Sequence, residues 1–392
     1  MAEALITPTV LKWARERAEF SDEEAAHKAG VKRERFLQWE EGEALPTFRQ
    51  AQLLAKAFRI PFGYLYLQAP PPEVDKIDIP DLRTVGGHRA SEFSLAFIDL
   101  YHDLLRKQEW FREYRLQEGA SELPFVGKFT IDNDYKDVAR DIREELGVNS
   151  KLRASARDWE HFITRLVEQA EMVEILVMRN SIVGNNTHRP LSVDEFRGLV
   201  ISDSVAPLVF INSADAKSAQ VFTLAHELAH LWIGESGVSN PMINGRKNGN
   251  QSHEVFCNKV ATEVLVPEDQ FIDDWDDSLD VEENLSRLSK QYRVSQLVIA
   301  RRGYDLDILD YEQFKKFYIS ALSFDRAKKQ RLTLSDGGPP PYTNQKIRNG
   351  RLFSQAVLSA AFSGRLPLRD AGFLLGLKPA KLRKFSNALV GK

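Results

Sequence analysis

The sequence predicts a mostly helical α+β protein with one small sheet. Helical patterns fill most of the 392 residues, whereas short apolar runs rich in branched residues cluster between residues 174 and 212, which is the pattern of buried strands. A proline-rich stretch, PPPEVDKIDIP, begins at residue 70 and indicates a linker. A chain of this length holds two or three domains. We therefore divide it into residues 1–69, a linker and helical spacer at 70–170, a sheet-containing domain at 171–310 and a basic helical region at 311–392.

The first 69 residues predict five short helices separated by turn residues. Within them, EEAAHKAGVKRERFLQWEEG (23–42) contains an alanine-rich helix, a turn at Gly30 and a second helix closed by Gly42. The apolar residues of this stretch are spaced to form the small core that joins two helices across a tight turn. They are Ala25, Ala29, Val31, Phe36 and Trp39. The spacing predicts a helix-turn-helix.

This segment resembles the Xre (phage-repressor-like) DNA-binding domain over about residues 8–67. The resemblance implies operator DNA as a partner and places Lys32, Arg33, Glu34 and Gln38 at the major groove. There Arg33 could bond guanine and Gln38 adenine, while Lys32 suits a phosphate. Lys32 also stands where such domains often have a Ser or Thr N-cap, so we expect a weaker cap. Ten basic and ten acidic residues cancel over residues 1–69, which leaves a helical protein-interaction module as the alternative.

Residues from about 91 to 165 have mostly helical patterns, and strands follow them. EILVMRN (174–180) and FRGLVISDSVAPLVFIN (196–212) predict strands, joined through the polar loop GNNTHRP (184–190).

A helix expected over about residues 215–233 contains the stretch TLAHELAHL. His226 and His230 lie four residues apart and therefore on one face, where two imidazoles can ligate one Zn²⁺. Glu227 projects beside them and can take a proton from a metal-bound water. Apolar residues cover most of the remaining circumference, so the helix is expected to be buried. Buried polar groups cost free energy unless they have a hydrogen-bond partner or bind a metal. The pattern therefore favours a metal site over two histidines buried in the core.

A catalytic zinc needs a third protein ligand, and the next expected helix, from near Ser252 to before Pro267, offers one. We assign Glu254 to this role, with His253 as the rival ligand. Asn258 lies one turn after Glu254 and could hydrogen-bond a ligand. Cys257 is a soft ligand by chemistry but is expected to fill the core.

The stretches FTLAHELAHLWIGESG and HEVFCNKVATEVLVP resemble the ImmA/IrrE family of zinc metallopeptidases, over about residues 172–267. The resemblance implies a gluzincin-like metallopeptidase domain that clips a repressor in the bacterial cytoplasm. It makes His226, His230 and Glu254 zinc ligands and Glu227 the general base. Phe256 stands where many members of the family have a second glutamate.

Peptide hydrolysis also needs a strand that holds the substrate and a group that stabilises the oxyanion. We expect APLVFIN or FRGLVIS to pair with the peptide. His188 and Arg189 could supply positively charged donors to the oxyanion, although a loop of this composition is more often only a turn.

The charge is divided unevenly along the chain. Residues 326–392 carry 14 Lys and Arg against two acids, a net of +12, so the first 325 residues carry −15 of the total −3. Such a basic segment indicates nucleic acid, an acidic protein partner or the chain's own acidic stretch at 268–283 as its contact, with a solubilising surface as the alternative. RDAGFLLGLKPAKLRKF (369–385) could form a second helix-turn-helix.

The N-terminus lacks the apolar core of a signal peptide, and no apolar run could cross a bilayer. Together with a single cysteine, Cys257, this predicts a cytoplasmic protein without a membrane partner. The layout resembles the long Xre–ImmA/IrrE proteins, often encoded beside a PIN-like ribonuclease toxin. Two functions follow, for a monomer or a homodimer. One is a DNA-binding regulator whose zinc endopeptidase cleaves a repressor or partner protein. The other is an antitoxin and autorepressor that binds operator DNA and a cognate toxin.

Overall fold

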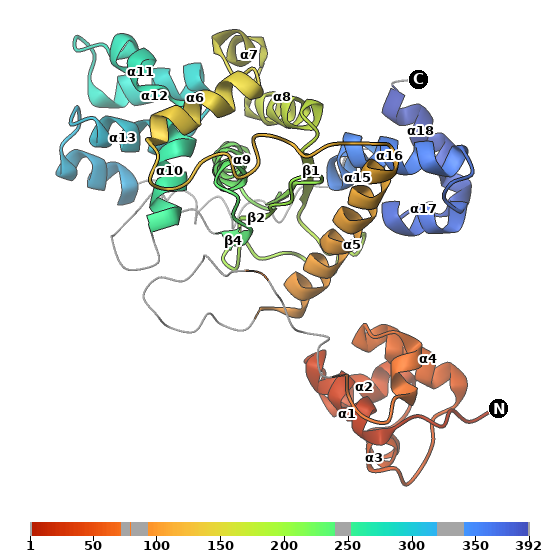
Figure 1. Ribbon diagram of the computed structural model, residues 1–392. Helices are drawn as coiled ribbons and strands as arrows, with labels where there is room; N and C mark the ends of the chain where they lie inside the picture. The colour runs from red at the N-terminus through yellow and green to blue at the C-terminus, as the bar shows by residue number, and fades with distance from the viewer. Residues whose placement is uncertain (1, 72–78, 80–92, 240–251, 320–340, 391–392) are drawn as a thin grey trace. The chain divides into compact units, whose positions relative to one another are not determined.

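The computed structural model describes residues 2–71, 79, 93–239, 252–319 and 341–390 (Figure 1). The chain forms two compact units, Met1–Asp78 and Ile79–Lys392. Each unit is described by itself. In the described residues, no helix is both long and apolar enough to cross a membrane.

The N-terminal unit is a bundle of five short helices, as predicted. They are α1 (Pro8–Arg17), α2 (Asp22–Ala29), α3 (Arg33–Glu41), α4 (Phe48–Phe58) and the 3-10 helix η1 (Phe62–Tyr66). Four of the predicted core residues of the helix-turn-helix are buried, and Val31 is partly buried against them. The turn between α2 and α3 passes through Gly30, whose φ of 70° is left-handed and favours glycine.

The two helices of this turn begin differently. Ser21 and Glu24 form a reciprocal capping box at the start of α2. Lys32, at the start of α3, makes no side-chain cap, which confirms the weaker cap expected there.

The second unit contains a four-stranded sheet of order β1-β3-β2-β4. The strands are β1 (Leu176–Asn180), β2 (Gly198–Ile201), β3 (Leu208–Asn212) and β4 (Gly237–Ser239). β1 runs parallel to β3, while β2 is antiparallel to both β3 and β4.

This order corrects the expected substrate strand. β2 and β3, which contain FRGLVIS and APLVFIN, are both internal, so neither has a free edge for a peptide. Among the described strands, β4 is the edge next to β2. The sequence does not predict β4, because its three residues, GVS, do not form an apolar run.

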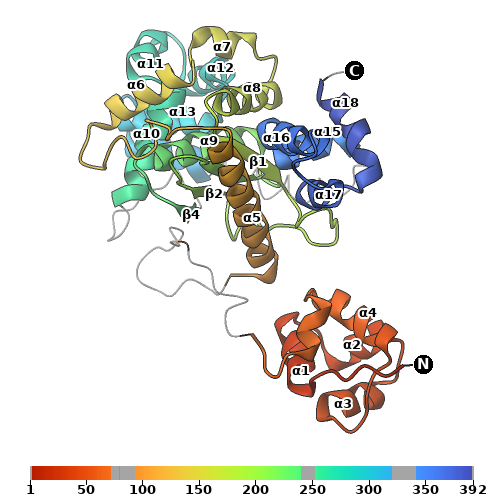
Figure 2. The same cartoon turned by 45° about the vertical axis from the view of Figure 1, so that its right-hand side comes forward.

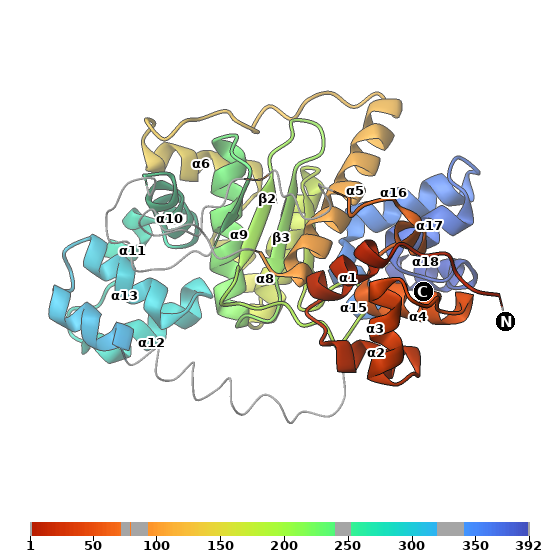
Figure 3. The same cartoon turned by 90° about the horizontal axis from the view of Figure 1, so that it is seen from below.

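Helices cover both faces of the sheet (Figure 3). Val200 and Val209 belong to the core shared with α8 (Trp159–Met172) and α9 (Lys217–Trp232). On the other face, Phe210 of β3 contacts Phe196, which packs edge-on against Phe97 of α5 (Leu95–Gln117).

Six further helices of this unit extend the α9 side of the sheet (Figures 1 and 2). They are α6 (Tyr135–Glu145), α7 (Ser150–Ser155), α10 (Ser252–Leu265), α11 (Glu268–Asp274), α12 (Val281–Tyr292) and α13 (Gln296–Asp305). α10 packs on both α9 and α6. One hydrophobic core runs from Phe125 to Phe314, so α6 and α8, which the sequence places in a spacer before residue 171, share the core of the sheet-containing domain.

The basic C-terminal region is helical, with α15 (Pro341–Asn349), α16 (Arg351–Phe362), α17 (Leu368–Leu375), the 3-10 helix η4 (Pro379–Lys381) and α18 (Leu382–Val390). α15 packs on β1, and α16 packs on α5. Lys107 of α5 donates to Asn349 at 3.0 Å, and Arg365 forms an ion pair with Glu118. In the described part of the chain, this region therefore docks on α5 and β1, and not on the acidic stretch at 268–283.

Candidate metal centre

The histidine pair lies on a helix that is buried on all sides. Every residue of α9 from Gln220 to Trp232 is buried, as the sequence predicts. His226, Glu227 and His230 have no exposed surface.

The predicted metal ligands meet at one point. The Nε2 atoms of His226 and His230 are 3.1 Å apart. Glu254, carried by α10, places Oε1 at 3.1 Å from His230 Nε2 and Oε2 at 3.3 Å from His226 Nε2. In a tetrahedral zinc site with bonds near 2.0–2.1 Å, neighbouring donors lie about 3.3 Å apart. Two imidazoles and a carboxylate at these distances fit a metal ion, and the three residues form a group that can hold one.

The charge balance within this group favours an ionised Glu254. Burial alone would raise the pKa of Glu254, but the charge of His226 and hydrogen bonds to both histidines lower it well below its usual range. Burial likewise opposes the charged form of His230, yet contacts with Cys257, Glu235 and Glu254 raise its pKa well above the ordinary value. Glu254 is thus held in its ionised form between the two imidazoles, which is the form of a carboxylate that ligates a cation.

Glu227 is held at the sheet beside this group. Its Oε1 accepts a short hydrogen bond from Ser239 Oγ of β4, whereas its Oε2 is buried and has no described partner. Gly198 of β2, paired with Ser239, makes room for the carboxylate, since a Cβ at residue 198 would overlap Glu227 Oε1. Burial raises the pKa of Glu227, although the neighbouring histidines and Ser239 lower it. A buried carboxylate oxygen without a partner is available to accept a hydrogen bond, as a general base must.

His253, the rival third ligand, contacts a different residue. Its Nδ1 forms a close ion pair with Glu235, and Glu235 Oε2 lies 3.8 Å from His230 Nδ1. Glu235, which the sequence does not single out, comes just after the turn at Gly234 that follows the end of α9 at Trp232. A carboxylate near the outer nitrogen of a ligating histidine is a common way to orient the imidazole.

Two neighbours of Glu254 on α10 differ from expectation. Asn258 makes no hydrogen bond to a ligand in the described residues, and its Oδ1 is buried without a partner. Cys257 is buried in the core as predicted, but it also contacts His230, and burial raises the pKa of its thiol.

The loop residues proposed for the oxyanion lie against α5. Arg189 forms an ion pair with Asp99 at 2.7 Å and donates to the Leu95 carbonyl at 3.1 Å. The His188 backbone donates to Asn186, and its side chain is exposed. Within the described residues, neither of them forms a hydrogen bond or an ion pair with the histidine pair, so their role in catalysis has no geometric support.

The groove-facing residues predicted in the N-terminal unit are on the surface of α3. Lys32, Arg33 and Glu34 are exposed, and Gln38 is half-buried. The Arg33 guanidinium forms an ion pair with Asp22 of α2 at 2.6 Å, which holds the pKa of that carboxyl below its usual range. Gln38 accepts a hydrogen bond from Arg35 at 3.0 Å. Binding to a base would therefore compete with these local contacts.

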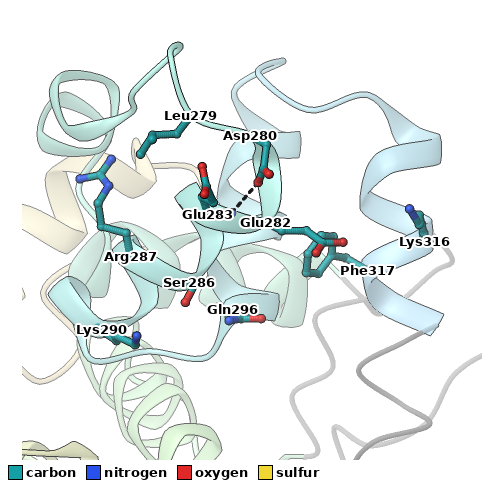
Figure 4. Close-up of a pocket in the computed structure, with 10 residues that line it drawn as sticks. All are labelled: Leu279, Asp280, Glu282, Glu283, Ser286, Arg287, Lys290, Gln296, Lys316 and Phe317. Carbon is teal, nitrogen blue, oxygen red and sulfur yellow. Dashed lines mark hydrogen bonds between the residues drawn. The ribbon is translucent and has the colours of Figure 1, made fainter.

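A surface hollow on the second unit is separate from the metal-binding group (Figure 4). Acidic residues of α12 and its start line it together with Arg287, Lys290 and Lys316. Asp280 caps α12 by accepting from the Glu283 backbone at 2.8 Å. None of its lining residues belongs to the group on α9 and α10.

The fold and the site together define a metallopeptidase-like domain, a histidine helix against a small sheet, in a chain that also has a helix-turn-helix unit. The comparisons agree with both assignments. Residues 170–303 match the IrrE N-terminal-like domain, a peptidase family, and residues 11–65 match the helix-turn-helix family. Residues 349–388 match a domain of unknown function. No curated protein matches the chain. The chain thus combines an Xre-like helix-turn-helix domain with an ImmA/IrrE-like peptidase domain.

Proposed function

We propose that this protein is a DNA-binding transcriptional regulator whose zinc-dependent endopeptidase domain cleaves a repressor or another partner protein. The observation that carries the proposal is the convergence of His226, His230 and Glu254 at 3.1–3.3 Å beside Glu227, whose Oε2 has no described partner.

Zinc is the metal that this donor set suits best. Two neutral imidazoles and one carboxylate with a fourth position open are the ligands of catalytic zinc in peptidases. Bound there, the metal would polarise a peptide carbonyl and acidify a water. His226 and His230 would hold the ion from α9, and Glu254 would complete the set from α10.

The other residues of the site would position the proton transfer and the substrate. Ser239 fixes Oε1 of Glu227, so that Oε2 is the oxygen left to accept a proton. β4 is the strand at the edge of the described sheet beside Glu227, and an extended peptide could add to it through main-chain hydrogen bonds. The N-terminal helix-turn-helix would bring the peptidase to an operator.

The test compares full-length wild type with Glu227→Gln in cells by sequencing newly formed protein N-termini. We expect N-termini that are present with wild type and absent with Glu227→Gln, because only the base is removed. Glu145→Gln, the same change at an exposed residue of α6, serves as the matched control and should behave as wild type.

A Glu227→Gln variant that keeps every cellular function would overturn the peptidase proposal. The alternative function, an antitoxin that binds a ribonuclease toxin, predicts that outcome. It also predicts that a toxin-encoding gene lies next to this one.

A further inference from the structure

We propose that the C-terminal helices α17, η4 and α18 form a second helix-turn-helix that binds duplex DNA. This goes beyond the proposed peptidase and the N-terminal DNA-binding unit, and it gives a function to the matched domain of unknown function at residues 349–388. α17, η4 and α18 correspond residue by residue to α2 and α3.

The two turns have the same backbone course. α2 and α17 each have eight residues and end at a left-handed glycine, Gly30 with φ 70° and ψ 36°, and Gly376 with φ 65° and ψ 31°. Two residues after each glycine comes a lysine with an extended backbone, Lys32 with φ −72° and ψ 152°, and Lys378 with φ −67° and ψ 140°. A helix, or η4 continuing into α18, then begins at once in both places.

The buried positions also correspond, at a constant separation of 346 residues in the sequence. Four pairs of equivalent residues are buried in both segments. These residues occupy the positions that join the two helices of such a motif. The pairs are Ala25 and Ala371, Ala29 and Leu375, Phe36 and Leu382, and Trp39 and Phe385. The correspondence therefore extends from the turn to the core of the motif.

The outer face of the second copy is the more basic of the two. Lys378, Lys381, Arg383 and Lys384 are exposed, and none forms an ion pair with a described residue. The equivalent face of α3 includes Glu34, and Arg33 there is engaged by Asp22. Over the described residues 341–390 there are nine Lys and Arg and one acid, Asp370.

The internal contacts of the motif leave this face free. Asn185 and Asn349 donate to the carbonyls of Gly376 and Leu375 at 2.7 and 3.1 Å, so the turn is fixed by α15 and by the loop that follows β1. α18 packs on α15 and α16 through Leu382, Phe385 and Leu389. It lies at the outer end of this group of helices (Figures 1 and 2).

The chemistry of the face indicates how it would bind. Lysine and arginine side chains that form no ion pair are suited to contacts with phosphates. Pro379 and Ala380 stand at the positions equivalent to Arg33 and Glu34, and their side chains cannot form hydrogen bonds with bases. We therefore assign to this motif sequence-tolerant contacts along the backbone of the duplex, next to base reading by the N-terminal motif.

The experiment measures binding of the full chain to a labelled 30-base-pair DNA duplex of mixed sequence over a range of salt concentrations. The variant Lys381→Ala/Arg383→Ala/Lys384→Ala should bind roughly tenfold more weakly at low salt, with the salt slope reduced by about three, since each lost phosphate contact lowers it by about one. Lys151→Ala/Arg157→Ala/Lys290→Ala removes the same charge from exposed residues elsewhere in the unit and should bind as wild type.

A charge-preserving variant separates folding from charge. Lys381→Arg/Lys384→Arg should keep both the affinity and the slope. Equal slopes for wild type and the triple alanine variant would overturn the proposal and would leave an acidic protein as the partner of this face. A slope lowered equally in the control triple variant would also overturn it, because only net charge would then matter.

Discussion

Ser239 of β4 donates a hydrogen bond to Glu227 of α9, directly opposite Gly198 in the β2–β4 pairing. The edge of the sheet and the histidine helix are thus joined through the proposed catalytic carboxylate. Gly198 is required there because any side chain would occupy the space of Glu227 Oε1 and lie 2.8 Å from Thr223 Cγ2.

Gly198→Ala should therefore displace Glu227 while leaving the metal ligands in place. We expect bound zinc close to wild type by elemental analysis, and a loss of cleavage of about 10²–10⁴-fold, the usual contribution of a general base. Gly63→Ala, where an added Cβ has no neighbour within 4 Å, is the matched control. Full cleavage by Gly198→Ala would mean that Glu227 is not held as described.

The metal ligands can be separated from their neighbours by substitution. His226→Ala and Glu254→Gln should lose most of the zinc, because each removes one of three ligands, whereas Glu227→Gln should keep it. His253→Ala should also keep zinc, since His253 contacts Glu235 and not the ligand group. Elemental analysis of the purified full chain gives the readout. Zinc lost in His253→Ala and kept in Glu254→Gln would reverse the assignment of the third ligand.

The N-terminal motif should read sequence through Arg33. Arg33→Ala should weaken binding to an operator near the gene by about 1–3 kcal/mol and relax the sequence preference. Asp22→Asn should not weaken it, because it releases Arg33 from its ion pair. Lys56→Ala, an exposed cation of α4, is the control for charge. Binding of wild type and Arg33→Ala that is equal on all duplexes would leave only an electrostatic contact.

The sequence predicted the residues whose spacing along one helix determines their geometry. His226, Glu227 and His230 follow from the helical period, and Glu254 from the chemistry of a third ligand. Contacts between distant segments could not be obtained this way. Ser239 lies in a three-residue strand without an apolar pattern, and Glu235 reaches His230 only because the chain turns after Gly234. The need for a glycine at position 198 depends on Glu227, 29 residues later in the chain.

The docking of the C-terminal helices should depend on pH through Glu171, at the end of α8. Its Oε1 accepts from the Leu352 backbone at 3.1 Å at the start of α16, and Gly350 allows this close approach because a Cβ there would overlap Glu171 Oε1. Burial raises the pKa of Glu171 to about 7 from an ordinary value of 4.5, although the α16 amides oppose this.

Because the folded-state pKa of Glu171 is raised, its favourable contribution is complete below pH 4.5 and is lost as the pH rises through about 7. The loss amounts to roughly 3 kcal/mol at most. Glu171→Gln keeps an acceptor for the α16 amides without the buried charge. Hydrogen exchange of the first turn of α16, measured for both proteins at each pH, should therefore be slower in the variant at pH 8 and equal at pH 5. Glu145→Gln should match wild type at both. Faster exchange in Glu171→Gln at pH 8 would show that the charge of Glu171 stabilises the helix start, and that the sign of its pKa shift is opposite to the one inferred from its burial.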